Sequence, residues 1–202
     1  MKSDAVAFGI AGVLFGLIAG WIIGSQQAAG RPPAAAPVAQ APASGGGATT
    51  RAAVLDETQV NALKTVAERE TTNATPRAQL GNLYFDAERY DEAIKWYGDA
   101  LKLAPKDVNV STDLGVSYYY SNQPDKALAQ FDTSLKLDPK HAKTLLNVGS
   151  VKAFGKQDLE GAEAAWKQVI AIAPDAPEGQ AAKRALDSLT SAHAGVGKKP
   201  GV

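Results

Sequence analysis

Few side chains in this 202-residue chain could perform acid–base or metal chemistry, and they are scattered. The two histidines, His141 and His193, lie far apart, and neither has a carboxylate or a second histidine four residues away. That spacing would place two ligands on one face of a helix. The absence of cysteine excludes thiolate metal sites, disulfides and a cysteine nucleophile. We therefore expect both histidines to be solvated, with no metal site and no cofactor.

Sequence motifs of catalytic sites are also missing. The chain has no glycine-rich phosphate loop, no HExxH pair and no nucleophile elbow. The carboxylates Asp91, Glu92 and Asp125 begin amphipathic segments, where acidic residues stabilise the helix dipole. With 21 basic and 21 acidic residues, net charge gives no attraction to nucleic acid. The sequence predicts a protein that is not an enzyme and does not bind nucleic acid.

A fixed period organises the second half of the chain. The pairs Leu80-Gly81, Leu114-Gly115 and Val148-Gly149 are spaced 34 residues apart. A small residue, an aromatic residue and a proline follow each pair: Ala93, Tyr97 and Pro105; Ala127, Phe131 and Pro139; Ala162, Trp166 and Pro174. The third unit has one extra residue between its glycine and its alanine. Such a period is typical of stacked helix–turn–helix units.

The residue types explain how one unit would fold. Each unit has two amphipathic segments, for example 76–88 and 91–104. The small residues Gly81 and Ala93 would let the two helices approach closely, and Tyr97 would fill the space between successive helices. Pro105 lacks an N–H group and should end the second helix. A single pair cannot bury its apolar face, so three stacked pairs are expected to form one core.

The pattern resembles the tetratricopeptide repeat (TPR) family over about residues 74–176. The leading tryptophan of the family is replaced by Arg77, Ser111 and Leu145, and Lys152 stands where the third unit should have tyrosine. The resemblance implies an all-α superhelix of three helix-turn-helix repeats at about 74–107, 108–141 and 142–176. We expect a TPR domain at 53–193, with a helix at Val54–Glu70 covering its open end, a capping helix at 177–192 and a disordered tail at 194–202.

The same resemblance implies where a partner binds, because the first helix of each pair lines the concave groove of such arrays. The residues at these positions are Asn82, Phe85, Asp86, Asn109, Asp113, Val116, Tyr119, Tyr120, Lys143, Asn147, Ser150 and Phe154. Amides there would bond to the backbone of a peptide or helix, and aromatic rings would contact its side chains. The three consecutive tyrosines 118–120 cannot all face one way, so at least one ring should be core.

The family's carboxylate-binding clamp is not preserved. Its five positions correspond to Ala78, Asn82, Asp113, Lys143 and Asn147. Only Asn82 and Lys143 match, while two cations are lost and Asp113 adds a negative charge. Because these changes disfavour a carboxylate ligand, recognition of an acidic tail is not expected.

The N-terminal region, residues 1–24, is predicted to be a tail and transmembrane anchor. Ala5 to Ile23 is a run of 19 residues without a charge. As a helix this run would be about 28 Å long, close to the thickness of a hydrocarbon core. A cleaved signal peptide is the alternative. Lys2 before the span predicts a bacterial inner-membrane protein with its repeats in the periplasm, although the opposite topology stays open.

Two further features accompany the anchor. Gly12, Gly16, Gly20 and Gly24 recur every four residues and could form a helix-packing face that supports a homodimer. The alternative is that they merely reflect the Ala/Gly-rich composition of the chain. Residues 25–52, rich in Ala, Pro and Gly, are predicted to be a disordered linker.

Together these features predict a membrane-tethered scaffold that binds a peptide or helix of a partner protein, during assembly of an envelope complex. Two alternatives stay open. One is a self-associating structural module. The other is a periplasmic chaperone-like accessory factor for secretion or cytochrome maturation, as the resemblance to anchored bacterial repeat proteins suggests.

Overall fold

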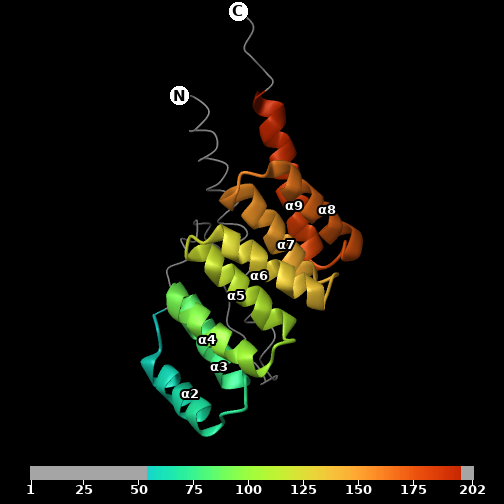
Figure 1. Ribbon diagram of the computed structural model, residues 1–202. Helices are drawn as coiled ribbons and strands as arrows, with labels where there is room; N and C mark the ends of the chain where they lie inside the picture. Colours follow the sequence, from blue (N-terminus) through green and yellow to red (C-terminus); the bar gives the residue numbers. More distant parts are fainter. Residues whose placement is uncertain (1–53, 197–202) are drawn as a thin grey trace, which may run out of the picture. The chain divides into compact units, whose positions relative to one another are not determined.

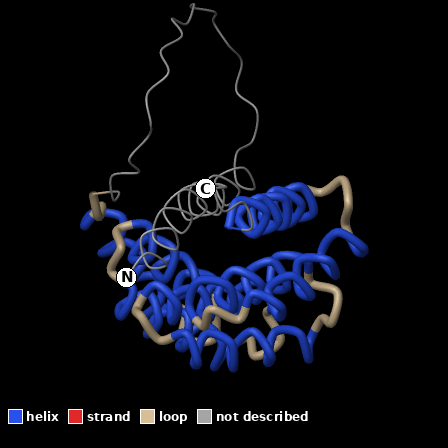
Figure 2. Tube along the Cα trace, turned by 90° about the horizontal axis from the view of Figure 1, so that it is seen from above, coloured by secondary structure: helices blue, strands red, loops and turns tan. Residues whose placement is uncertain are grey.

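The computed structural model describes residues 54–196, and their side chains as far as Ser191. This part of the chain contains eight α-helices, one π-helical turn and no strand (Figure 2). The elements are α2 (Glu57–Arg69), α3 (Thr75–Asp86), α4 (Tyr90–Leu103), α5 (Val108–Tyr120), α6 (Pro124–Leu137), α7 (Ala142–Ser150), η1 (Val151–Gly155), α8 (Leu159–Ile172) and α9 (Pro177–Val196). The predicted all-α repeat with eight helices is confirmed.

Neighbouring helices in the sequence are neighbours in space. Figure 1 shows α2 to α9 following one another along the array, and each helix contacts the next. The pairs α3/α4, α5/α6 and α7/α8 form the three repeats, with α2 against α3 and α9 against α8 and α7. No helix within residues 54–196 is long and apolar enough to cross a membrane. The predicted anchor with Gly12, Gly16, Gly20 and Gly24, and the predicted linker, lie outside the described residues.

Glycine brings the two helices of each repeat into contact. A Cβ atom added to Gly81 would lie 2.5 Å from Cδ1 of Tyr97, far inside van der Waals distance. Gly115 meets Phe131 in the same way, and Gly149 meets Trp166. All three rings are at most 1% exposed. The prediction that small residues permit close approach while an aromatic ring fills the interface is confirmed.

Helix ends follow local chemistry. The carboxylate of Asp56 accepts hydrogen bonds from the backbone N–H groups of Thr58 and Gln59, at 3.0 and 3.1 Å. This cap makes α2 begin at Glu57, three residues later than Val54, the predicted start. At the other end of a pair, α4 stops at Leu103, with Pro105 two residues beyond.

The extra residue of the third repeat is absorbed by η1. In the first two repeats, Arg89 N donates to Tyr84 O and Gln123 N to Tyr118 O, which are five residues earlier. In the third, Asp158 N donates to Lys152 O, six residues earlier. The π-helical turn therefore takes up the additional residue before the chain reverses, and α8 still packs against α7.

The three positions that lack the family's tryptophan are filled differently. Arg77 donates from its guanidinium to the carbonyl oxygens of Ala67 (2.8 Å) and Asn73 (2.7 Å), which fastens the end of α2 to α3. The Ser111 and Ser134 hydroxyls lie 2.7 Å apart between α5 and α6. Leu145 is simply buried. The first of these contacts joins the flanking helix α2 to the repeats.

Candidate partner-binding face

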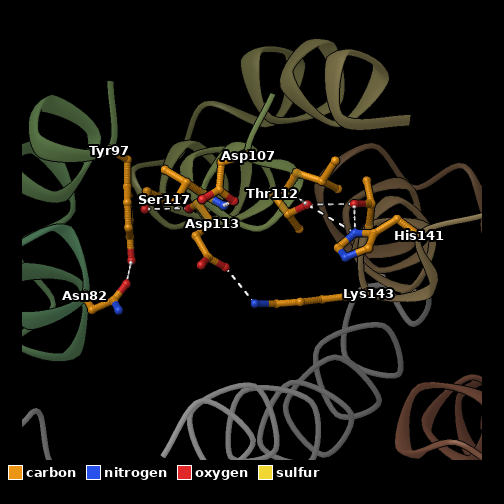
Figure 3. A network of polar contacts seen from close by, with 11 residues as sticks. Asn82, Tyr97, Asp107, Thr112, Asp113, Ser117, His141 and Lys143 are labelled. Carbon is orange, nitrogen blue, oxygen red and sulfur yellow. Dashed lines mark hydrogen bonds and ion pairs between the residues drawn. The ribbon is translucent and has the colours of Figure 1, made fainter. Parts of the chain in front are cut away.

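The residues predicted to bind a partner lie on the first helix of each repeat, α3, α5 and α7, except for Phe154 in η1. We call this set of residues the first-helix face. Figure 3 shows Asn82, Asp113 and Lys143 succeeding one another across these three helices. The face has a polar centre, an aromatic end and members that point into the core.

An ion pair forms the polar centre of the first-helix face. Lys143 Nζ on α7 donates to Asp113 Oδ1 on α5 at 2.7 Å, and the two side chains are 19% and 13% exposed (Figure 3). Burial raises the pKa of Asp113, and the nearby positive charge of Lys143 opposes this rise. The charge of Lys143 is thus neutralised within the chain.

Asn82 is held in one orientation by a tyrosine of the neighbouring helix. The Tyr97 hydroxyl donates to Asn82 Oδ1 at 2.7 Å (Figure 3). Because an amide oxygen accepts here, the amide nitrogen of Asn82 is left on the other side as a donor. Burial raises the pKa of Tyr97 strongly, and the negative charges of Asp113 and Asp86 add to this effect. Tyr97 therefore interacts with all three of Asn82, Asp86 and Asp113, through a hydrogen bond to the first and through the charges of the other two.

Asp86 is a half-buried carboxylate at the end of α3. Burial raises its pKa, and the charge of Asp113 raises it further. No hydrogen bond or ion pair satisfies this carboxylate among the side chains described, residues 54–191. Asp86 is therefore a charged group that the described part of the chain leaves uncompensated.

Asn147 carries a buried donor without an acceptor. The residue is 3% exposed, and its Nδ2 atom has no hydrogen-bond partner in the part of the chain that the structure describes. Such a group costs roughly 1–3 kcal/mol and calls for an explanation. Asn147 lies one helical turn after Lys143, so the two side chains share one face of α7.

Four aromatic rings gather where the first and second repeats meet. Tyr120 stacks on Tyr90 with ring centroids 5.2 Å apart, and Phe85 meets both rings edge-on at 5.6 and 5.4 Å. Tyr119 contacts Tyr120 at 5.6 Å. Burial raises the pKa of Tyr90 to about 12 and that of Tyr120 still further. Tyr90 was missed in the sequence because it begins a second helix.

The remaining members of the face divide by exposure. Ser150 and Val116 are 6% and 4% exposed, and the Ser150 hydroxyl donates to the Leu146 carbonyl at 3.1 Å. Both therefore contribute to the core. Asn109 is exposed near the start of α5, and Phe154 is half-buried in η1. Among the three tyrosines, Tyr118 lies under the ammonium of Lys126, whereas Tyr119 and Tyr120 belong to the aromatic group.

The expectation of a solvated His141 is wrong. This residue is half-buried ahead of α7, and its Nδ1 atom shares a 2.7 Å hydrogen bond with the Thr144 hydroxyl, which also bonds to the Thr112 hydroxyl at 2.7 Å (Figure 3). Burial lowers the pKa of His141. The contact with Thr112 joins α5 to α7, a pairing that local sequence does not reveal. The side chain of His193 lies outside the described part.

Comparisons with known proteins agree with this geometry. Models of the TPR repeat and the tetratricopeptide repeat match residues 81–121 and 112–177. Curated protein sequences give no significant match. Among solved structures, the first TPR of Spaghetti (RPAP3) bound to an HSP90 peptide is 24% identical, with a TM-score of 0.54, covering 60% of this chain and 94% of that one.

Two further solved structures are similar. The crystal structure of MamA is 16% identical with a TM-score of 0.55, and covers 69% of this chain and 90% of its own. The NMR structure of the first TPR domain of human RPAP3 is 23% identical with a TM-score of 0.52, and covers 59% and 94%. These likenesses establish the fold.

Proposed function

Because residues 81–177 are tetratricopeptide repeats, we propose that this chain is a protein-interaction scaffold whose first-helix face binds a peptide or helix of a partner. The observation that carries the proposal is the amide nitrogen of Asn147, which is buried and has no acceptor among the described residues. Rotation of the Asn147 side chain toward a bound segment would let a carbonyl oxygen of that segment satisfy it. Asn82 offers a second amide nitrogen on α3, so a segment lying across α3, α5 and α7 could use both.

The RPAP3 domain supports the general mode of binding but not the same ligand. That domain is bound to an HSP90 peptide, so a similar fold holds a short segment of another protein. In this chain the ammonium of Lys143 is engaged by Asp113, and Ala78 offers no charge. An acidic tail would therefore lack free cations, and we propose a partner of different charge.

Membrane tethering belongs to the proposal as well. Its support is the charge-free run Ala5 to Ile23. We propose that this run anchors the scaffold in a bacterial envelope, with the repeats in the periplasm. Alkaline extraction and mass spectrometry of the mature N-terminus test the anchor. Retention in membranes with Met1 or Lys2 present supports it, whereas a mature end between Ala28 and Arg31 shows a cleaved signal. A separate test concerns the helix-packing face of glycines in this run. If Gly16→Ile prevents the isolated span from forming dimers, the glycine face is supported.

A photo-crosslinking experiment tests the binding face. Asn109 is exposed on α5, so a photoreactive residue there replaces no buried side chain, and Lys95, exposed on the second helix α4, gives a matched control site. We expect a partner adduct from position 109 in native membranes that is weakened by Asn147→Ala. An adduct from position 95 alone would contradict the proposal. Adducts only between copies of this chain would favour the self-associating module.

A further inference from the structure

We infer that the partner segment carries a basic side chain, best an arginine, that pairs with Asp86 while Asn147 donates to the backbone of the same segment. This inference rests on the proposed function and adds the chemistry of the ligand. It differs from recognition of an acidic tail, because the charge required of the partner has the opposite sign.

The charge balance at the polar centre leaves one carboxylate without a cation among the described residues. Asp86 and Asp113 are close enough for each negative charge to be felt at Tyr97, and Lys143 compensates only one of them through its contact with Asp113. Among the side chains of residues 54–191, no ion pair reaches Asp86. One negative charge therefore remains, and it lies on a half-buried carboxylate where pairing with a cation is stronger than at an open surface.

The buried amide on α7 adds a second requirement for the partner segment. Asn147 lies one turn beyond Lys143 on the same face of that helix, and its unpaired Nδ2 atom needs an acceptor. A free cation in solution could neutralise Asp86 but could not satisfy this donor. A peptide offers both groups at once, because its backbone carries carbonyl oxygens and its side chains can carry charge.

Aromatic rings on the neighbouring first helix indicate the kind of cation. Tyr120 occupies on α5 the repeat position that Asp86 occupies on α3, 34 residues earlier. Tyr120 also stacks on Tyr90, so an aromatic surface lies on the neighbouring first helix. A guanidinium group can pair with a carboxylate through a planar fork and lie against an aromatic ring, whereas an ammonium is a point charge. Arginine therefore fits this combination better than lysine.

Selection of peptides on the full chain tests the inference. Random peptides displayed on phage are selected on the purified protein, and the enriched peptides are synthesised with their basic residue or with glutamine in its place. We expect enrichment of arginine at one fixed position. Binding should weaken roughly 10- to 100-fold in Asp86→Asn, as expected for loss of a charged hydrogen bond. Asp132→Asn, an exposed carboxylate on α6, should leave it unchanged.

The outcomes separate this inference from the proposed function. The glutamine peptide should bind the unaltered chain and Asp86→Asn equally, because the removed pair is then absent from both. Enriched peptides without basic residues, or with acidic ones, that lose binding in Asn147→Ala would overturn the inference and leave the proposed function standing. Peptides whose binding survives both Asn147→Ala and Asn82→Ala would contradict the proposed function itself. Circular dichroism of each variant confirms that it remains helical.

Discussion

Lys143 and Asp113 form an ion pair across two repeats, from α7 to α5, with 2.7 Å between Nζ and Oδ1 and side-chain exposures of 19% and 13%. The pair therefore stabilises the stacking of the second and third repeats as well as setting the charge of the first-helix face. Its partial shielding from water places it between an exposed pair, worth up to about 1 kcal/mol, and a fully buried one.

Removal of the cation alone should be costly. Lys143→Met removes the cation that faces the shielded Asp113 carboxylate, so we expect the free energy of unfolding to fall by about 1–3 kcal/mol. Denaturant unfolding measures this change. The double variant Lys143→Met/Asp113→Leu should recover part of the loss, because neither charge of this ion pair is then left behind. Asp113→Leu is measured alone as well. If the free-energy changes of Lys143→Met and Asp113→Leu simply add up in the double variant, the contact between the two residues contributes nothing.

Asp86 should lower stability at neutral pH. Burial and the charge of Asp113 raise the pKa of Asp86, so the folded state holds this proton more tightly than the unfolded state. Its contribution to stability is lost as pH rises from its ordinary value of 3.8 through the raised folded value. Asp86→Asn should therefore increase the free energy of unfolding at neutral pH and have no such effect at about pH 3. An equal gain at both values would exclude the carboxylate charge as its cause.

Deletion of Gly155 should be tolerated. This deletion shortens the third repeat to the spacing of the other two, so η1 can become a regular helical turn. We expect cooperative unfolding with a free energy within about 1 kcal/mol of the unaltered chain, measured by thermal and denaturant unfolding. Deletion of Ser121 is the control, because the second repeat has no extra residue to lose. Equal damage from both deletions would show that η1 does not absorb the insertion.

Two glycines should respond in opposite directions to alanine. A Cβ atom on Gly115 would collide with the Phe131 ring, so Gly115→Ala should lower the free energy of unfolding by about 1–3 kcal/mol. A Cβ atom on Gly98, within α4, meets nothing within 4 Å. Gly98→Ala should therefore raise it by roughly 0.5–1 kcal/mol through helix propensity. Similar melting temperatures for both variants would contradict the close approach at Gly115.

The repeat architecture was predictable because its causes are local and recur. The glycine of each first helix and the aromatic residue of the second stand at fixed offsets, and the structure brings Gly81 against Tyr97 as expected. The extra residue of the third repeat could be counted in the sequence. The sequence could not show that this residue is taken up in η1, because an extra residue anywhere before the turn gives the same number of residues in the repeat.

The candidate site was harder to predict, because its contacts join residues about 30 positions apart on different helices. Asp113 was expected to repel a ligand, yet it first engages Lys143. The charge of Asp86 and the bonding of His141 likewise depend on neighbours from other helices. Register identified which helix face these residues occupy, whereas the pairing of donors and acceptors required coordinates.

The central claim is that a partner segment binds the first-helix face, and side-chain amide NMR tests it most directly. The full chain, labelled with nitrogen-15 in detergent micelles, is titrated with a peptide selected on it. We predict that the Nδ2 signals of Asn147 and Asn82 shift, while the amide signal of Gln168, exposed on the second helix α8, stays in place. A shift at Gln168 with unmoved signals from Asn147 and Asn82 would contradict the claim.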